Sequence, residues 1–152
     1  MRGETSPVTK TRVLFLCTGN SARSILGEAL LRAMGGNTFD VHSAGTEPKG
    51  INPYTAKVLA EEGIDASGLR SKGVEELLGQ KFDYVITVCD DAAEHCPVFP
   101  GAPARVHWRF PDPAAVEGDD GRKLAAFRET LLGLRRRLVP FIAEARGASE
   151  AG

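Results

Sequence analysis

The amino-acid sequence predicts a single α/β domain in which helices flank both faces of a four-stranded parallel sheet. Its 152 residues are the length of one ordinary domain rather than two. Short apolar runs with strand character alternate with segments of helical periodicity, which is the pattern of a parallel sheet covered by helices. Right-handed crossovers leave few topologies for such a chain. A ligand is expected beyond the carboxyl ends of the strands.

The first half of the chain contains two predicted strands and two predicted helices. Residues 12–17 (RVLFLC) are a short apolar run ending in a glycine-containing turn, which is typical of a buried parallel strand. Residues 24–34 carry apolar side chains on one helical face, and two glycines end that helix. Residues 39–43 predict a second strand. Residues 53–62 predict a helix with proline in its first turn and a glycine directly after it.

The second half contains the remaining two strands and a long terminal helix. Residues 73–78 predict a short helix, and residues 84–89 (YVITVC) are the most strand-like stretch in the chain. Residues 106–110 are a weaker candidate for the fourth strand. From residue 121 to 145, apolar side chains recur at steps of three and four. This periodicity predicts a long helix that bends or ends near Pro140.

Composition and charge limit the function classes that need to be considered. The domain is expected over residues 11–145, with a flexible arm at 1–10 and a flexible tail at 146–152, because both ends are polar and lack apolar periodicity. A formal charge of −1 offers no broad basic surface for nucleic acid. The apolar run at 13–17 is too short to span a bilayer. Three cysteines do not make a disulfide-rich secreted scaffold, so we expect a cytoplasmic protein with reduced thiols.

The turn after the first strand has the composition of an oxyanion-binding loop. In residues 17–24 (CTGNSARS), a cysteine is followed five residues later by an arginine, and a helix begins at once. Backbone N–H groups and the helix N-terminus can surround a tetrahedral anion there, and Arg23 can donate to two of its oxygens. The same positive surroundings favour the thiolate form of Cys17. The expected oxyanion-binding residues are Thr18, Gly19, Asn20, Ser21, Ala22, Arg23 and Ser24. The alternative is a buried structural cysteine before an ordinary helix.

Residues 13–24 (VLFLCTGNSARS) resemble the active-site loop of the low-molecular-weight protein tyrosine phosphatase fold and, more narrowly, that of arsenate reductases built on it. The similarity continues through the segments at 42–45 (HSAG), 87–90 (TVCD), 96–97 (CP), 107–108 (HW) and 112–114 (DPA). It covers nearly the whole chain except the two ends. The resemblance implies a sheet with flavodoxin-like winding and an enzyme of the thioredoxin-coupled type.

Two further cysteines, Cys89 and Cys96, lie seven positions apart in the sequence. A phosphatase that acts through Cys17 alone needs neither, whereas a reductase needs a source of two electrons, which thiols provide. In one α-helix the two Cα atoms would lie roughly 10 Å apart. A disulfide requires less than about 7 Å, so its formation would force the segment to unwind or loop out. The alternatives are two unrelated reduced cysteines, or a metal site that includes His95. The spacing disfavours a metal site, and none is expected.

Asp112 is the candidate general acid. It stands between Pro111 and Pro113, which restrict the backbone and hold its carboxyl group within a narrow range of positions. A carboxylic acid aimed into the oxyanion pocket can protonate a leaving oxygen. An aspartate before proline is also ordinary turn chemistry, and the residues alone favour that simpler interpretation. The family resemblance shifts the expectation to the general acid.

A polar network is expected behind the loop. Asn20 is predicted to brace the loop through its amide, with Glu28 and Ser43 as further members of the network. By resemblance, some relatives hold a cation in this network with an additional acidic residue. The comparable position in this chain is Lys72, whose ammonium group is expected to replace such an ion.

The resemblance implies a reaction in which three cysteines act in sequence. Cys17 attacks arsenate while Asp112 protonates the leaving hydroxide, which gives a covalent thiol–arsenic adduct. Cys89 then attacks Cys17, so that arsenite is released and a disulfide remains. Cys96 attacks Cys89 and carries the disulfide to an external reductant. Phosphate and sulfate would compete with arsenate for the loop.

No bound cofactor is expected, because the electrons would come from thioredoxin or from glutathione with glutaredoxin. The chain is expected to be a monomer with no nucleic-acid or membrane partner. One alternative is a low-molecular-weight tyrosine phosphatase that uses Cys17, Arg23 and Asp112. The cysteine pair counts against it, as does Ala114-Ala115, where such phosphatases carry an aromatic residue. A second alternative is a redox-sensing or oxyanion-binding module without turnover.

Overall fold

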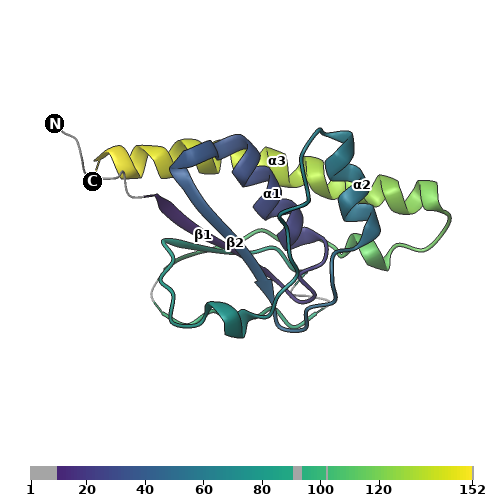
Figure 1. Ribbon diagram of the computed structural model, residues 1–152, viewed down its shortest axis with the longest axis horizontal. Helices are drawn as coiled ribbons and strands as arrows, with labels where there is room; N and C mark the ends of the chain where they lie inside the picture. The colour runs from purple at the N-terminus through teal and green to yellow at the C-terminus, as the bar shows by residue number, and fades with distance from the viewer. Residues whose placement is uncertain (1–9, 91–93, 102, 152) are drawn as a thin grey trace.

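Four strands pair in parallel in the order β2-β1-β3-β4 (Figure 1). The computed structural model describes residues 10–90, 94–101 and 103–151. In chain order its elements are β1 (Thr11–Cys17), α1 (Arg23–Gly35), η1 (Gly36–Thr38), β2 (Phe39–Gly45), α2 (Pro53–Glu61), η2 (Val74–Leu77), β3 (Tyr84–Thr87), β4 (Ala104–His107), η3 (Pro113–Ala115) and α3 (Asp120–Ala151), where η denotes a 3-10 helix. The predicted four-stranded parallel sheet is confirmed.

Strand β1 lies in the middle of the sheet because its central residues are apolar on both faces. Val13 and Phe15 belong to one core, whereas Leu14 and Leu16 belong to the other, and all four are fully buried. The alternation follows from the period of two in a strand. In register, Leu16 of β1 pairs with Thr87 of β3, so the two strands end side by side.

The two faces of the sheet are covered differently. The larger core joins one face to α1, α2 and α3, which lie together along one side of the sheet in Figure 1. The smaller core on the other face is closed by Leu77 of η2 and by Phe82 and Phe99, which lie outside the regular elements. A short 3-10 helix therefore stands where the sequence predicted the helix at 73–78.

Several predicted boundaries are wrong. Strand β4 begins and ends earlier than the predicted 106–110. Strand β3 ends at Thr87 rather than Cys89, although the Val88 N–H still donates to the Leu16 carbonyl at 2.9 Å. The chain therefore leaves the sheet just before Cys89, which frees that cysteine from strand pairing.

Helix α3 continues through Pro140 to Ala151, beyond the predicted end at residue 145. Leu138 and Phe141, on either side of the proline, are both buried in the larger core and hold the two parts of the helix in place. Arg146 donates a hydrogen bond to the Gly35 carbonyl at 3.0 Å, at the end of α1. Residues 146–151, predicted as part of a flexible tail, are thus helical, whereas the predicted arm lies outside the described residues except for Lys10. Within the described ranges, no helix is long and apolar enough to cross a membrane.

Candidate active site

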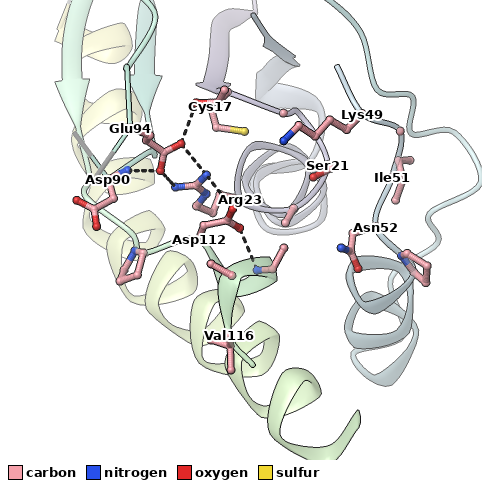
Figure 2. A pocket seen from close by; sticks show the side chains of 18 residues that line it. Cys17, Ser21, Arg23, Lys49, Ile51, Asn52, Asp90, Glu94, Asp112 and Val116 are labelled. Carbon is pink, nitrogen blue, oxygen red and sulfur yellow. Dashed lines mark hydrogen bonds and ion pairs between the residues drawn. The ribbon is translucent and has the colours of Figure 1, made fainter. Parts of the chain in front are cut away.

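A cavity of about 780 Å³ lies beyond the carboxyl ends of β1 and β3, where the sequence predicts the ligand (Figure 2). The first turn after β1 forms one wall, the segment around Lys49 a second, and the turn that carries Asp112 a third. The polar and charged side chains that line it are those of Cys17, Thr18, Ser21, Arg23, Lys49, Asn52, Asp90, Glu94 and Asp112. Gly19 and Ala22 of the loop also line it, whereas Asn20 and Ser24 do not.

The loop from Cys17 to Arg23 is held from outside by its own backbone. The carbonyls of Thr18, Gly19 and Ser21 accept hydrogen bonds from the backbone N–H groups of residues 47, 49 and 52, at 2.9 to 3.0 Å. Gly45 permits this close approach, because a Cβ there would come within 2.5 Å of the Thr18 carbonyl oxygen. With these carbonyls bound outside, the loop backbone keeps one curved conformation.

Asn20 braces the loop from behind rather than lining the cavity. It is fully buried and has a φ of 43°, in the left-handed region that asparagine tolerates better than most residues. Its Nδ2 donates to the hydroxyls of Ser24 at 2.8 Å and Ser43 at 3.0 Å. Its Oδ1 accepts from the Lys72 backbone N–H at 2.8 Å. One amide thus joins the loop to β2 and to the segment before η2.

The network continues behind Asn20. Ser43 donates to the buried Glu28 carboxylate, which also forms an ion pair with Arg32. The Lys72 side chain is buried beside them and donates to the Arg70 carbonyl at 3.1 Å. Burial lowers the pKa of Lys72, and the negative charge of Glu28 opposes that shift. Lys72 and Glu28 therefore lie close enough to interact electrostatically.

Cys17 is the free thiol of the site and is 2% exposed. Its Sγ lies 2.8 Å from the Ser24 hydroxyl, at the N-terminal end of α1. The sulfur therefore has a hydroxyl partner and lies at the end of the helix where backbone N–H groups are free. Because Cys17 also lines the cavity, its sulfur can reach a bound anion.

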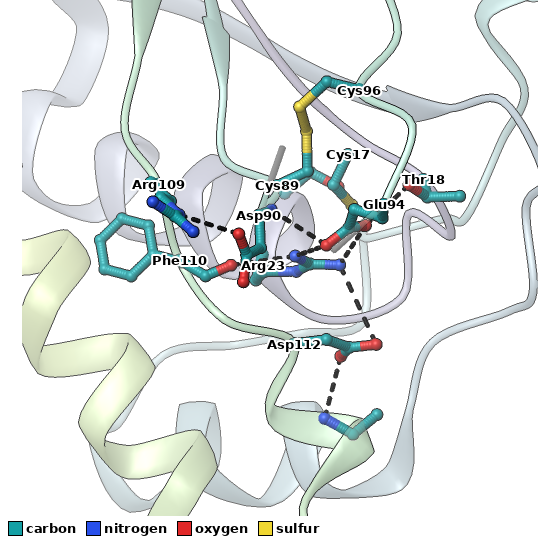
Figure 3. Close-up of polar contacts among 12 residues, drawn as sticks. Cys17, Thr18, Arg23, Cys89, Asp90, Glu94, Cys96, Arg109, Phe110 and Asp112 are labelled. Carbon is teal, nitrogen blue, oxygen red and sulfur yellow. Dashed lines mark hydrogen bonds and ion pairs between the residues drawn. A yellow bond between two sulfur atoms is a disulfide. The ribbon is translucent and has the colours of Figure 1, made fainter. Parts of the chain in front are cut away.

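Arg23 is almost entirely buried, and a carboxylate from another segment neutralises it (Figure 3). Glu94 accepts from both ends of the guanidinium, with Nη1 to Oε2 at 2.5 Å and Nη2 to Oε1 at 2.9 Å. Glu94 also accepts from the Thr18 hydroxyl at 2.8 Å and from the Asp90 backbone N–H at 2.9 Å. The guanidinium further donates to the Phe110 carbonyl at 3.0 Å.

These contacts shift the pKa values of both partners. Burial alone would raise the pKa of Glu94, but the hydrogen bonds from Arg23, Asp90 and Thr18 lower it from 4.5 to about 2. Burial alone would lower the pKa of Arg23, but Glu94 and the negative charges of Cys17 and Asp112 raise it overall. Both groups therefore stay charged at ordinary pH.

Asp112 lies at the mouth of the cavity, immediately before η3. Its Oδ1 accepts from the Ala114 N–H at 2.9 Å, which orients the carboxyl group, and its Oδ2 lies 4.0 Å from Nη2 of Arg23. The side chain is 43% exposed. The carboxyl group is therefore in contact with water on one side and faces the Arg23 guanidinium on the other.

Cys89 and Cys96 form a disulfide, with their Cα atoms 6.0 Å apart. The described residues between them are not helical, in keeping with the expectation that this bond requires a looped-out segment; residues 91–93 lie outside the described residues. Cys89 is fully buried and belongs to the same core cluster as Cys17, whereas Cys96 is partly exposed. One sulfur of the disulfide thus faces the interior near the site, and the other is closer to solvent.

Sequence reasoning missed three charged residues of the cavity: Lys49, Asp90 and Glu94. Lys49 adds a second positive side chain, and Figure 2 shows it reaching across the loop. Glu94 is one of several acids between the two cysteines, and its position two residues before Cys96 was the only available signal. Across the described ranges, no group of three or more histidine, cysteine or acidic side chains is arranged to hold a metal ion.

Comparison with known proteins points to one family. Residues 12–146 match the family described as low molecular weight phosphotyrosine protein phosphatase. The chain is 42% identical over 134 residues to an arsenate reductase of Halalkalibacterium halodurans. The aligned region covers 88% of this chain and 96% of that protein.

Two solved structures of arsenate reductases have a similar fold. An arsenate reductase from Archaeoglobus fulgidus is similar with a TM-score of 0.72 and 30% identity, over 86% of this chain and 98% of that one. A thioredoxin-dependent arsenate reductase from Corynebacterium glutamicum is similar with a TM-score of 0.66 and 31% identity. That similarity covers 90% of this chain but 63% of the other.

Proposed function

The chain belongs to the low molecular weight phosphotyrosine protein phosphatase family, and from that premise we propose that it is an arsenate reductase. The observation that carries the proposal is the Cys89–Cys96 disulfide beside the anion-binding loop. A phosphatase has no use for a dithiol that opens and closes next to its nucleophile. A reductase must take up two electrons in each cycle, and this pair can deliver them.

The first step forms a bond between sulfur and arsenic. Arsenate enters the cavity, where Arg23 and the backbone N–H groups of the loop bind its oxygens. The Cys17 thiolate attacks arsenic, and Asp112, in its protonated form, gives a proton to the departing hydroxide, which leaves as water. The product is a covalent adduct in which arsenic is still pentavalent.

The next two steps move the electrons and regenerate Cys17. The Cys89 thiolate attacks the Cys17 sulfur, and the sulfur–arsenic bond breaks with its electron pair going to arsenic. Arsenite leaves and a Cys17–Cys89 disulfide remains. Cys96 then attacks Cys89, which frees the Cys17 thiolate and produces the Cys89–Cys96 disulfide that this structure contains. Two thiols have become one disulfide, and arsenic has gained two electrons.

An external thiol system must reduce that disulfide to complete the cycle. We propose thioredoxin, because the Corynebacterium glutamicum relative is named as thioredoxin-dependent. The partly exposed sulfur of Cys96 is where an incoming thiolate would attack. Glutathione with glutaredoxin is the alternative source of electrons. A monomer in the cytoplasm fits a reductant of this kind.

The test is arsenite production from arsenate by purified protein with thioredoxin, thioredoxin reductase and NADPH. Wild type should turn over repeatedly, and Cys89→Ser should yield no steady-state arsenite. Cys96→Ser should release about one arsenite per chain and then stop as the Cys17–Cys89 disulfide. An undiminished steady-state rate in Cys96→Ser would refute the mechanism in which the three cysteines react in turn. A failure with thioredoxin that glutaredoxin repairs would change only the reductant.

The phosphatase activity for which the family is named uses the same Cys17, Arg23 and Asp112. Two results together would show that the protein is a phosphatase rather than a reductase. Wild type and Cys89→Ser would hydrolyse an aryl phosphate equally fast, and neither reductant would support arsenite production. Slow hydrolysis of a phosphate ester beside rapid arsenate reduction would not contradict the proposal, because arsenate and phosphate share shape and charge.

A further inference from the structure

We infer that Glu94 is an internal competitor of the oxyanion: while the Cys89–Cys96 disulfide is in place, its carboxylate takes the donors that would otherwise bind substrate. The inference deepens the proposed function and rests on it, since it concerns how the same site is cleared and refilled. Glu94 therefore acts in the disulfide form through Arg23 and Thr18, as a positioning residue rather than a catalytic one.

The contact pairs the two oxygens of a carboxylate with the two terminal nitrogens of a guanidinium. A carboxylate and an arsenate each present two oxygens at the spacing that a guanidinium fork accepts. Glu94 places one oxygen on each terminal nitrogen of Arg23 and one of them also on the Thr18 hydroxyl. Both donors lie on the predicted oxyanion loop (Figure 3). The same guanidinium cannot offer this fork to a second anion at the same time.

The position of Glu94 depends on the disulfide. Glu94 lies two residues before Cys96, and the disulfide holds the Cys89 and Cys96 Cα atoms 6.0 Å apart. Its carboxylate also accepts from the Asp90 backbone N–H, next to Cys89. Glu94 is therefore tied to both cysteines, to Cys96 through two backbone residues and to Cys89 through the Asp90 N–H. If the segment were helical in the dithiol form, with the two Cα atoms roughly 10 Å apart, these two anchors would move relative to each other.

Occupation by Glu94 prevents an unproductive reaction. Once Cys96 has attacked Cys89, Cys17 is again a free thiolate beside an oxyanion loop. A second arsenate that reacted with it would form an adduct with no thiol left to resolve it, because Cys89 is oxidised. A carboxylate on Arg23 excludes that arsenate until an external dithiol has returned both electrons. By linkage, an oxyanion must in turn oppose the disulfide form.

The experiment measures binding of inorganic phosphate by isothermal titration calorimetry, so it does not depend on turnover. The disulfide form and the dithiothreitol-reduced form are compared for wild type, Glu94→Gln and Glu129→Gln. Glu129 is exposed on α3 and does not line the cavity, so its variant makes the same charge change away from the site. We expect the wild-type disulfide form to bind phosphate about 10-fold more weakly than the reduced form, within the usual range for coupled sites.

In Glu94→Gln the two forms should bind phosphate within about two-fold of each other, whereas Glu129→Gln should keep the wild-type ratio. Equal affinities of the two wild-type forms, or the full difference surviving in Glu94→Gln, would overturn the inference. If phosphate binds to neither redox form of any of the three proteins, the oxyanion site itself is refuted and the proposed function falls with it. If the ratio fails but arsenate turnover stands, only the role of Glu94 is lost.

Discussion

Removal of the buried Asn20 amide should destabilise the protein strongly for so small a change. Asn20→Ala deletes three hydrogen bonds, each contributing roughly 1 kcal/mol net, so about 3 kcal/mol is lost. The Ser24 and Ser43 hydroxyls keep Cys17 and Glu28 as partners, so the Lys72 N–H is the group left unpaired. Alanine at a φ of 43° adds about 1 kcal/mol of backbone strain, for a total of about 4 kcal/mol.

Urea denaturation of the disulfide form, followed by circular dichroism, measures this loss. With a slope of about 2 kcal/mol per molar urea, the midpoint of Asn20→Ala should fall by about 2 M. Asn37→Ala is the matched control, because Asn37 is exposed in η1, and its change should stay within about 0.5 kcal/mol. A midpoint shift below about 0.5 M for Asn20→Ala would refute the reasoning. The backbone bonds from residues 47 to 52 would then suffice to hold the loop.

Three further predictions concern the site itself. Asp112→Asn should lower kcat for arsenate about 100-fold, because it removes the proton donor. Phosphate affinity should change little, because Arg23 is intact. Steady-state kinetics measures the first effect and calorimetry the second. Gly45→Ala should weaken phosphate binding, because the new Cβ would meet the Thr18 carbonyl oxygen at 2.5 Å, whereas Gly68→Ala, which meets nothing, should not. Folding lowers the pKa of Glu94 from 4.5 to about 2, so its stabilising effect is present above pH 4.5 and lost as the pH falls to 2; acid-unfolding curves of wild type and Glu94→Gln should converge there.

The parts of the site that sequence could predict are those built from one short segment. Cys17 and Arg23 are the first and last of seven consecutive residues, and the strand, the turn and the helix around them carry their own local signals. The contact of Arg23 with Glu94 joins residues 71 positions apart, and Glu94 lies within the ring that the Cys89–Cys96 disulfide closes. No local pattern marks one acid among several as the one that reaches the arginine.

The errors in the element boundaries have the same origin. Pro140 lacks a backbone N–H donor, so the sequence predicts that the helix bends or ends there. The missing hydrogen bond does weaken the helix locally, although the helix continues. Leu138 and Phe141 bury their side chains against elements far away in sequence, and that packing keeps the helix continuous. Strand β4 likewise takes its bounds from its partner, because Tyr84 pairs with Ala104 and Thr87 with His107. Pairing and burial, rather than the apolar pattern alone, decide such ends.

The placement of the cysteines explains how one anion loop can serve two kinds of chemistry. Because Leu16 pairs with Thr87, β1 and β3 end side by side. Cys17 is one residue after Leu16, and Cys89 is two residues after Thr87. Capture of an oxyanion needs only the loop after β1. Reduction adds the segment after β3, whose far end carries Cys96 and, two residues earlier, Glu94. That segment therefore delivers the electrons and then, with the disulfide closed, sets a carboxylate on Arg23 in place of the substrate. Electron transfer and clearing of the site are thus two results of closing one disulfide.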